Sequence, residues 1–341
     1  MRNVQAAARL GGLVASGLSD VTSDLAALDS AGRWAVVIPY RGVPVLARFE
    51  HWVPASAASV GGVWTGSQPS AWKSSENEES YISAVQRVRA LIESGDVYQA
   101  NVCRVLSAQL SDLSACDVGG LHALLDAGNP SPYGGFVRVP GAHVATASPE
   151  LFLRRTGRHI ESGPIKGTGR VEEDLTQKDR AENIMIVDLV RNDLSAICET
   201  GSVNVPELLR VEKHPGLVHL VSRVSGELRN TATWPKILAS TFPPGSVTGA
   251  PKSSALRIID EVESVSRDVY CGAIGWVDAD TGEAELAVAI RTFWVEGDQV
   301  HFGTGAGITW GSDPTREWQE TQLKAAHLID VASGVWQGAI S

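Results

Sequence analysis

The chain has 341 residues, which suits one large domain or two of medium size. Its 29 basic and 39 acidic residues give a formal charge of −10, and no basic tract occurs, so no nucleic-acid partner is expected. No apolar run reaches the roughly 18–20 residues of a membrane helix, and the first residues lack the pattern of a secretory signal. The sequence therefore predicts a cytoplasmic protein with no membrane association.

The first 75 residues are weakly patterned. Apolar runs at 34–40 and 43–49 flank Arg41 and Gly42 and predict a β-hairpin. Pro39 and Pro44 cannot donate to a strand ladder, so we expect this hairpin at the edge of a sheet. The Ser-, Gly- and Ala-rich stretch 55–75 is typical of a linker. We therefore predict a short N-terminal region, 1–75, packed on a catalytic domain, 76–341.

Stronger patterns follow from residue 77 onward, and they alternate clusters of strands with single helices. Such clusters predict an α+β fold with mainly antiparallel sheets. Helices are expected at 77–95, 121–127, 174–200, 253–264 and 314–333, and strands at 97–110, 136–139, 143–147, 203–212, 217–228, 271–278, 283–294 and 299–303.

Several segments carry residue types suited to chemistry. Lys166 lies in a stretch of small residues, 161–170, which we interpret as a loop that can approach a ligand closely. Asp179 and Glu182 share one helix face, and two acidic helix faces can converge on one Mg²⁺. The last helix supplies the second such face with Glu317, Glu320 and Lys324. Ordinary solvated side chains explain each segment about as well when it is considered alone.

Further candidates are single residues or short turns. Ser246 and Thr248 precede a helix and can donate to an anion, while the glycine-rich run 303–308 permits close backbone approach. Structural roles remain open for all of them. The other candidates are Glu150 as an acid, Arg291 as a carboxylate ligand, His219 in an apolar strand, and Tyr270 as a phenol donor.

The order of short motifs along the last three quarters of the chain resembles the chorismate-utilising enzymes. That family includes anthranilate synthase component I, aminodeoxychorismate synthase component I, isochorismate synthase and salicylate synthase. Each motif alone is weak, but the ordered set is specific. The motifs are 95–101 (GDVYQAN), 129–133 (NPSPY), 147–150 (ASPE), 164–168 (PIKGT), 182–193 (ENIMIVDLVRND), 219–223 (HLVSR), 243–252 (PPGSVTGAPK), 270–275 (YCGAIG), 289–292 (AIRT), 305–307 (GAG) and 317–324 (EWQETQLK).

The resemblance implies a fold of two large, mainly antiparallel sheets packed together and flanked by helices, with the site between them. It implies Mg²⁺ held by Glu182 and Glu320, with Asp179 and Glu317 in support through water. Lys166 would be a nucleophile and Glu150 a general acid. The positions implied to bind chorismate are Gln99, Gly167, Thr168, His219, Ser246, Thr248, Gly249, Tyr270, Arg291, Gly305, Ala306, Gly307 and Lys324.

Two positions discriminate among the members of the family. PIKGT at Lys166 resembles aminodeoxychorismate synthase, which makes 4-amino-4-deoxychorismate for 4-aminobenzoate and folate synthesis, whereas anthranilate synthases usually have Ala there. Gln99 stands where isochorismate and salicylate synthases place a lysine base, which disfavours water as nucleophile. The alternatives are anthranilate synthase, the water-using enzymes, and a silent chorismate-binding subunit.

The resemblance also implies ammonia delivered by a separate glutamine amidotransferase subunit, because no such domain fits in this length. Two features depart from the family pattern. The family commonly has Glu at the position of Asp179, and the short N-terminal region shows no Leu-Leu-Glu-Ser signature of a tryptophan site.

Overall fold

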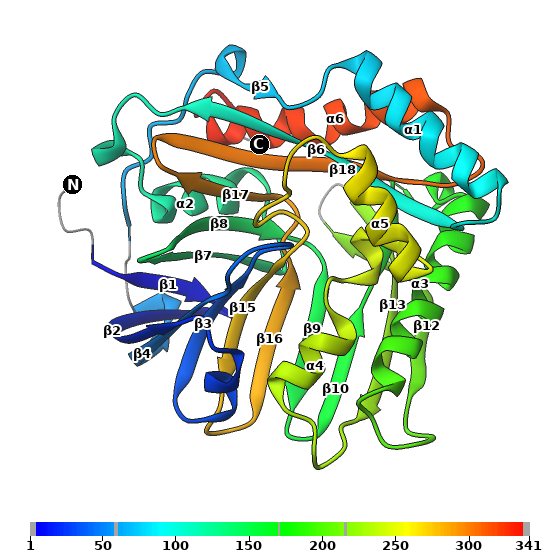
Figure 1. The fold of residues 1–341 in the computed structure, drawn as a ribbon. Coiled ribbons are helices and arrows are strands. Elements are labelled where there is room, and N and C mark those ends of the chain that lie inside the picture. The colour runs from blue at the N-terminus through cyan, green and yellow to red at the C-terminus, as the bar shows by residue number, and fades with distance from the viewer. Residues whose placement is uncertain (1–4, 58–60, 170, 215–216, 337–341) are drawn as a thin grey trace.

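The computed structural model describes residues 5–57, 61–169, 171–214 and 217–336, and its strands form a single antiparallel sheet (Figure 1). From one end to the other, neighbouring strands are β5–β6–β18–β17–β8–β7–β1–β2–β4–β3–β15–β16–β9–β10–β13–β12, with β14 beside β6 and β11 beside β13. The strands are β1 (Ala7–Leu10), β2 (Leu13–Thr22), β3 (Arg33–Ile38), β4 (Val45–Pro54), β5 (Lys73–Ser74), β6 (Gln99–Gln109), β7 (Tyr133–Val139), β8 (Ala142–Ser148), β9 (Leu151–Thr156), β10 (His159–Gly163), β11 (Ile165–Gly169), β12 (Asn204–His214), β13 (Leu217–Glu227), β14 (Gly249–Ala250), β15 (Ala273–Asp278), β16 (Glu283–Val288), β17 (Thr292–Glu296) and β18 (Gln299–Ile308).

The α+β class is confirmed, but the expectation of two separate sheets is wrong. The N-terminal strands join the two halves, because β1 pairs with β7 (Ala8 opposite Val137) and β3 pairs with β15 (Val37 opposite Ile274). The sheet is strongly bent, so β6 and β18 run along the top of the molecule in Figure 1 while β13 and β12 lie at its right. A sequence pattern reports strands and their faces but not a hydrogen-bonded link between two strand clusters.

The N-terminal hairpin forms as expected from β3 and β4, but its edge position is wrong. Strand β3 is bounded by β4 on one side and β15 on the other. Pro39 and Pro44 lie in the connection between the strands and not in the ladder, so neither removes a sheet hydrogen bond. The strands of 1–75 thus belong to the same sheet as those of 76–341.

Six α-helices of the described residues pack against this sheet, and side-chain caps set several of their starts. Asn77 and Asp313 each accept a backbone N–H of the first turn, and Thr176 forms a capping box with Asp179. That box starts the long helix at 177, so the expected start at 174 is too early, and the helix ends before the expected 200. The helices are α1 (Glu78–Glu93), α2 (Val118–Gly128), α3 (Gln177–Ser195), α4 (Trp234–Thr241), α5 (Lys252–Val262) and α6 (Pro314–Ala332).

Three segments differ from the expected pattern in ways that matter for the site. Residues 161–170 were expected as a loop, yet their described part mostly forms β10 and β11, joined at Pro164. The glycine run 303–308 is the end of β18 and pairs along β6. The strand expected over 283–294 is split in two, because Arg291 adopts a left-handed conformation with φ of 51°.

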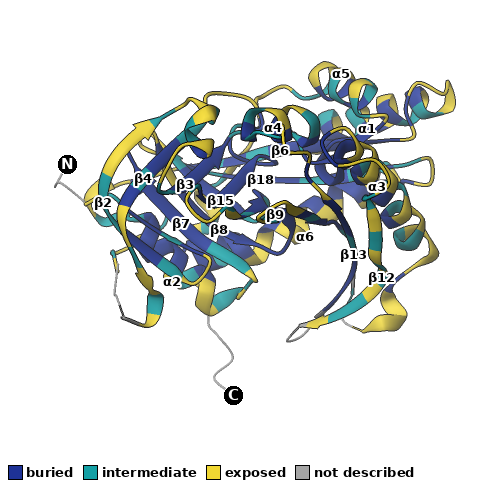
Figure 2. Cartoon of the chain, turned by 90° about the horizontal axis from the view of Figure 1, so that it is seen from below, coloured by how far each residue is buried: buried dark blue, intermediate teal, exposed yellow. Residues whose placement is uncertain are grey.

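Burial follows the sheet and the inner helix faces (Figure 2). The largest apolar cluster runs from Trp34 through Ile274 to Trp234, and smaller clusters lie under α2 and α6 and under α1 and α5. None of the helices in the described ranges is both long and apolar enough to cross a bilayer.

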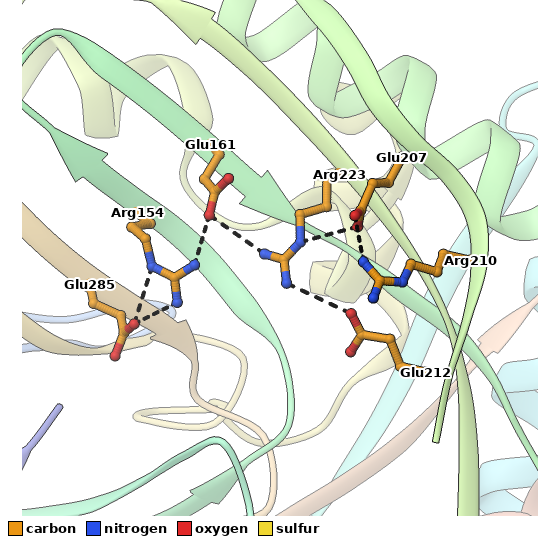
Figure 3. A network of polar contacts seen from close by, with 7 residues as sticks. All are labelled: Arg154, Glu161, Glu207, Arg210, Glu212, Arg223 and Glu285. Carbon is orange, nitrogen blue, oxygen red and sulfur yellow. Dashed lines mark hydrogen bonds and ion pairs between the residues drawn. The ribbon is translucent and has the colours of Figure 1, made fainter. Parts of the chain in front are cut away.

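A ladder of alternating charges crosses five neighbouring strands, β16, β9, β10, β13 and β12 (Figure 3). Arg154 lies between Glu285 and Glu161, 2.7 Å from each. Arg223 faces Glu161 at 3.5 Å and continues the ladder toward β12. Its partners there are Glu207 at 3.6 Å and Glu212 at 3.8 Å, and Glu207 in turn pairs with Arg210 at 2.5 Å.

Candidate active site

The two ends of the folded sheet meet where β11 approaches β18 and β6. A Cβ built on Gly307 of β18 would lie 2.6 Å from Gln99 Nε2, 3.3 Å from Asn101 Oδ1 and 3.4 Å from Lys166 Nζ. Gly307, Gln99 and Lys166, which are far apart in sequence, therefore line one space. A side chain at position 307 would fill that space, and glycine keeps it open.

Lys166 extends from β11 toward the short turn η6 (Gly245–Val247), and its ammonium donates to the Ser246 carbonyl at 3.2 Å. Burial lowers the pKa of Lys166 below its usual range, and this outweighs the carboxylates of Glu182 and Glu150, which act in the opposite direction. A lysine with a lowered pKa has more of the free amine that can act as a nucleophile at neutral pH.

Glu150 lies between β8 and β9, and only 4% of its surface is exposed. Burial raises its pKa to about 7. The Ser246 hydroxyl, the Lys166 ammonium and the Ile165 N–H oppose that rise. A carboxyl that still holds its proton near neutral pH is suited to general-acid catalysis.

The turn after α4 serves both of these groups. Ser246 offers its hydroxyl to Glu150 and its carbonyl to Lys166. The Thr248 hydroxyl instead donates to the carbonyls of Pro244 and Gly245, at 3.1 and 3.3 Å, and so stabilises the turn itself. Gly249 has a φ of 145°, and a Cβ there would lie 2.0 Å from the Gln99 carbonyl, so β14 can approach β6 only with glycine.

Gln99 is fully buried beside this turn. Its Nε2 donates to Asn101 Oδ1 at 3.4 Å, and Asn101 Nδ2 donates to the Ser246 carbonyl, also at 3.4 Å. Gln99 Oε1 has no hydrogen-bond partner among the described residues. A buried amide oxygen without a donor is costly, which favours a ligand group there.

The acidic faces of α3 and α6 do approach each other. Lys178 bridges them, with its Nζ 3.6 Å from Glu182 Oε1 and 3.5 Å from Glu317 Oε1. Burial alone would lower the pKa of Lys178, but Glu317, Glu182 and Glu320 outweigh it and raise the pKa. Three carboxylates thus act on a single cation.

This arrangement fits a divalent cation in its charge and oxygen donors, since Mg²⁺ favours one or two carboxylates and several waters. No group of three or more His, Cys, Asp or Glu side chains within the described ranges is already spaced to hold a metal ion. The Glu182 and Glu317 side chains are 13% and 6% exposed, whereas Glu320 is half exposed and pairs with Lys324 at 2.6 Å.

Other predicted metal and anion ligands have partners within the protein. Asp179 Oδ2 accepts from the backbone N–H and the hydroxyl of Thr176, at 2.8 and 2.7 Å, so its carboxylate caps α3. Lys324 donates to the Gly305 carbonyl at 3.2 Å, which places it over the end of β18. These side chains lie around the site, but each would have to exchange a partner to bind a ligand.

Arg291 is the strongest candidate for a carboxylate ligand. Its guanidinium has neither an ion pair nor a hydrogen bond with any described residue, and burial lowers its pKa. A partly buried guanidinium without a partner in the protein favours an anion with two oxygens. Tyr270 is buried with its ring against Gly303, where a Cβ would lie 2.0 Å from Tyr270 Cγ.

The remaining predicted positions lie on the neighbouring strands β18, β11 and β13. Gly305 and Ala306 pair with Cys103 and Val102 across β18 and β6. Gly167, with a φ of 81°, would place a Cβ 2.8 Å from Asp179 Cβ, so glycine lets β11 approach α3. His219 is buried opposite the Thr168 backbone on β13, and the Thr168 side chain lies outside the described part of the structure.

Sequence reasoning did not single out Lys178 or Asn101. Lys178 lies one helical turn before Glu182, and this i, i+4 spacing is a signal that could have identified it. Asn101 lies two residues after Gln99 on the same face of β6, within the motif 95–101.

Comparison with known proteins agrees with these features. Residues 62–330 match the family model described as chorismate binding enzyme. Anthranilate synthase component 1 1 of Haloarcula marismortui is 41% identical over 264 residues, which cover 74% of this chain and 53% of that protein. Aminodeoxychorismate synthase component 1 of Klebsiella aerogenes is 36% identical over 290 residues, which cover 82% of this chain and 63% of that protein.

The fold is also found among solved structures. Anthranilate synthase component I from Streptococcus pneumoniae aligns with a TM-score of 0.76 at 26% identity, covering 89% of this chain and 84% of that one. The aligned region spans between about half and two thirds of the curated relatives' length. By this match and the ordered site residues, the chain belongs to the chorismate-binding enzyme family.

Proposed function

We propose that the chain is an aminodeoxychorismate synthase component I, which converts chorismate and ammonia to 4-amino-4-deoxychorismate. The observation that carries the proposal is Lys166, whose amine reaches the site between the Ser246 carbonyl and Gly307 and has a lowered pKa. It lies beside Glu150, whose pKa of about 7 suits an acid. Amine and acid together allow covalent displacement of a poor leaving group.

Substrate binding follows from the charges around the space. The unpaired Arg291 guanidinium and the Gly305–Gly307 strand end would hold one carboxylate of chorismate. Glu182 and Glu320 would hold Mg²⁺, with Glu317 and Asp179 in support through water. When bound, the metal would neutralise the second carboxylate and make the ring a better electron sink.

The reaction then uses two residues in turn. The Lys166 amine adds at C2, both ring double bonds shift, the C4–O bond breaks, and the Glu150 proton leaves with that oxygen as water. Ammonia next adds at C4, the double bonds shift back, and the C2–N bond breaks to release Lys166. The proton lost by the incoming nitrogen restores Glu150. Gln99 would not act as a base for water, because an amide does not accept a proton at working pH.

A product assay tests the proposal. The purified chain is incubated with chorismate, Mg²⁺ and ammonium, with an aminodeoxychorismate lyase in half of the samples, and products are identified by chromatography and mass. A 4-aminobenzoate peak that needs the lyase and drops at least about 100-fold in Lys166→Ala supports it. The exposed lysine at 213, changed to Ala, is the matched control and should leave the product unchanged.

Anthranilate synthase is the second candidate, because several of the related proteins carry that name. It predicts anthranilate and pyruvate without the lyase, and little effect of Lys166→Ala. A separate glutamine amidotransferase partner is proposed for either activity, since both relatives are named as components. Rates with glutamine plus such a subunit, compared with ammonium alone, test that part.

A further inference from the structure

A buried ion pair, Arg267 with Glu263, contacts the backbone of β6 and η6 next to the site. Arg267 is 2% exposed, and its Nε and Nη2 donate to the Glu263 carboxylate at 2.6–3.2 Å. Its guanidinium also lies over the Tyr40 ring, 4.5 Å from the centroid. Such a pair is costly to bury and is a weak source of net stability, so its geometry calls for another explanation.

The pair joins the two backbone segments that carry the site. Arg267 Nη1 donates to the Val247 carbonyl at 2.7 Å, and Nη2 donates to the Asn101 carbonyl at 3.2 Å. Glu263 Oε1 accepts the Cys103 N–H at 2.9 Å. One side-chain pair therefore fixes both η6 and the start of β6.

Two consecutive carbonyls of the turn have different partners, one at Arg267 and one in the site. The Val247 carbonyl points back to Arg267, while the preceding carbonyl, of Ser246, points forward and accepts from Lys166 and Asn101 Nδ2. Rotation of these peptides would move the Ser246 carbonyl away from Lys166 and the Ser246 hydroxyl away from Glu150. The contacts therefore link Arg267, through the η6 turn, to the residue that touches both Lys166 and Glu150.

We propose that Arg267, held by Glu263, is a positioning residue that sets Ser246 against Lys166 and Glu150. The proposal rests on the proposed function only for the catalytic roles of those two residues. Because a planar guanidinium donates in several fixed directions at once, a lysine ammonium can replace only part of it.

The test compares Arg267→Met and Arg267→Lys by two readouts. The first is kcat and KM for chorismate across pH. The second, which needs no substrate, is the ¹³C titration of the Glu150 carboxyl in glutamate-labelled protein, assigned by its loss in Glu150→Gln. The groups facing Glu150 are the Ser246 hydroxyl, the Lys166 ammonium and the Ile165 N–H.

In Arg267→Met we expect kcat to fall at least about 10-fold with KM nearly unchanged, because the reacting groups and not the substrate contacts are displaced. The Glu150 pKa should rise, since the Ser246 hydroxyl that lowers it moves away. Arg267→Lys should recover part of the lost kcat and bring the Glu150 pKa part of the way back to its wild-type value. Arg138→Met removes another buried arginine paired with an aspartate, Asp117, whose hydrogen-bond partners do not include this turn, and it should leave the titration unchanged.

A folded Arg267→Met enzyme with a uniform loss of rate at every pH and an unchanged Glu150 titration would overturn the proposal, leaving the pair a structural one. If that variant does not fold, Arg267→Lys and Glu263→Gln decide, because both must raise the Glu150 pKa. If the wild-type protein turns over no chorismate, the proposed function is refuted instead. The Glu150 titration in the Arg267 variants would still test the positioning role of Arg267.

Discussion

The burial of Glu150 predicts that this residue destabilises the protein at alkaline pH. Its pKa rises from an ordinary 4.5 to about 7. Below pH 4.5 the carboxyl holds its proton in both the folded and unfolded chain. Between these values only the folded chain holds it, so the free energy of unfolding falls with pH. The free energy of unfolding is therefore roughly 3 kcal/mol lower above pH 7 than below pH 4.5, at 1.36 kcal/mol for each unit of pKa.

Glu150→Gln keeps the shape and removes the ionisation. The variant should match the wild type near pH 4.5 and exceed its free energy of unfolding by up to ~3 kcal/mol at pH 8. This gain is reduced by the attraction between the Lys166 ammonium and the ionised Glu150 carboxylate, which the variant loses. Urea unfolding at four values between pH 4.5 and 8 measures the difference. Glu50→Gln, whose side chain is 63% exposed, is the control. Parallel curves for wild type and Glu150→Gln would refute the argument.

Three other changes have distinct outcomes. Lys178→Met should bind Mg²⁺ more tightly by calorimetry, because the ammonium competes for the same carboxylates; an unchanged Kd would contradict this. Gly307→Ala should weaken chorismate binding about 10-fold or more by filling the space, whereas Gly311→Ala, which meets no atom within 4 Å, should not. Arg223→Met removes the centre of the charge ladder and should cost ~1 kcal/mol of stability in urea unfolding. Arg210→Met, at its exposed end, should have no measurable cost.

The sequence predicted most of the regular elements after residue 77, because helix periodicity and caps are local. Asn77 and the apolar residues of α1 identify that helix without tertiary information. The motif order also brought together positions that the structure places around one space, among them Lys166, Gln99 and Gly307. Their roles remain predictions for the assays above.

Long-range effects account for what could not be predicted. The 161–170 segment has the composition of a loop, yet β13 imposes strand geometry on it by pairing with β10 and β11. A left-handed Arg291 ends one strand and starts the next, and nothing in the run 283–294 signals that break. Arg267 and Glu263 are four apart on the sequence like any surface pair, and only the fold shows that they are buried next to the site.

Because the site is built from both ends of one bent sheet, its geometry depends on a contact that holds those ends together. Lys166 comes from β11, which pairs with β13 near one end of the sheet, while Gln99 and Gly307 come from β6 and β18 near the other end. Small changes in the bend along the intervening strands would add up at the point where the ends meet. The η6 turn, paired to β6 through β14 and reached by Lys166 from β11, is where both ends make contact. If Arg267 holds that turn rigidly, it fixes the distance between the Lys166 amine and the Glu150 carboxyl independently of changes in the bend of the sheet.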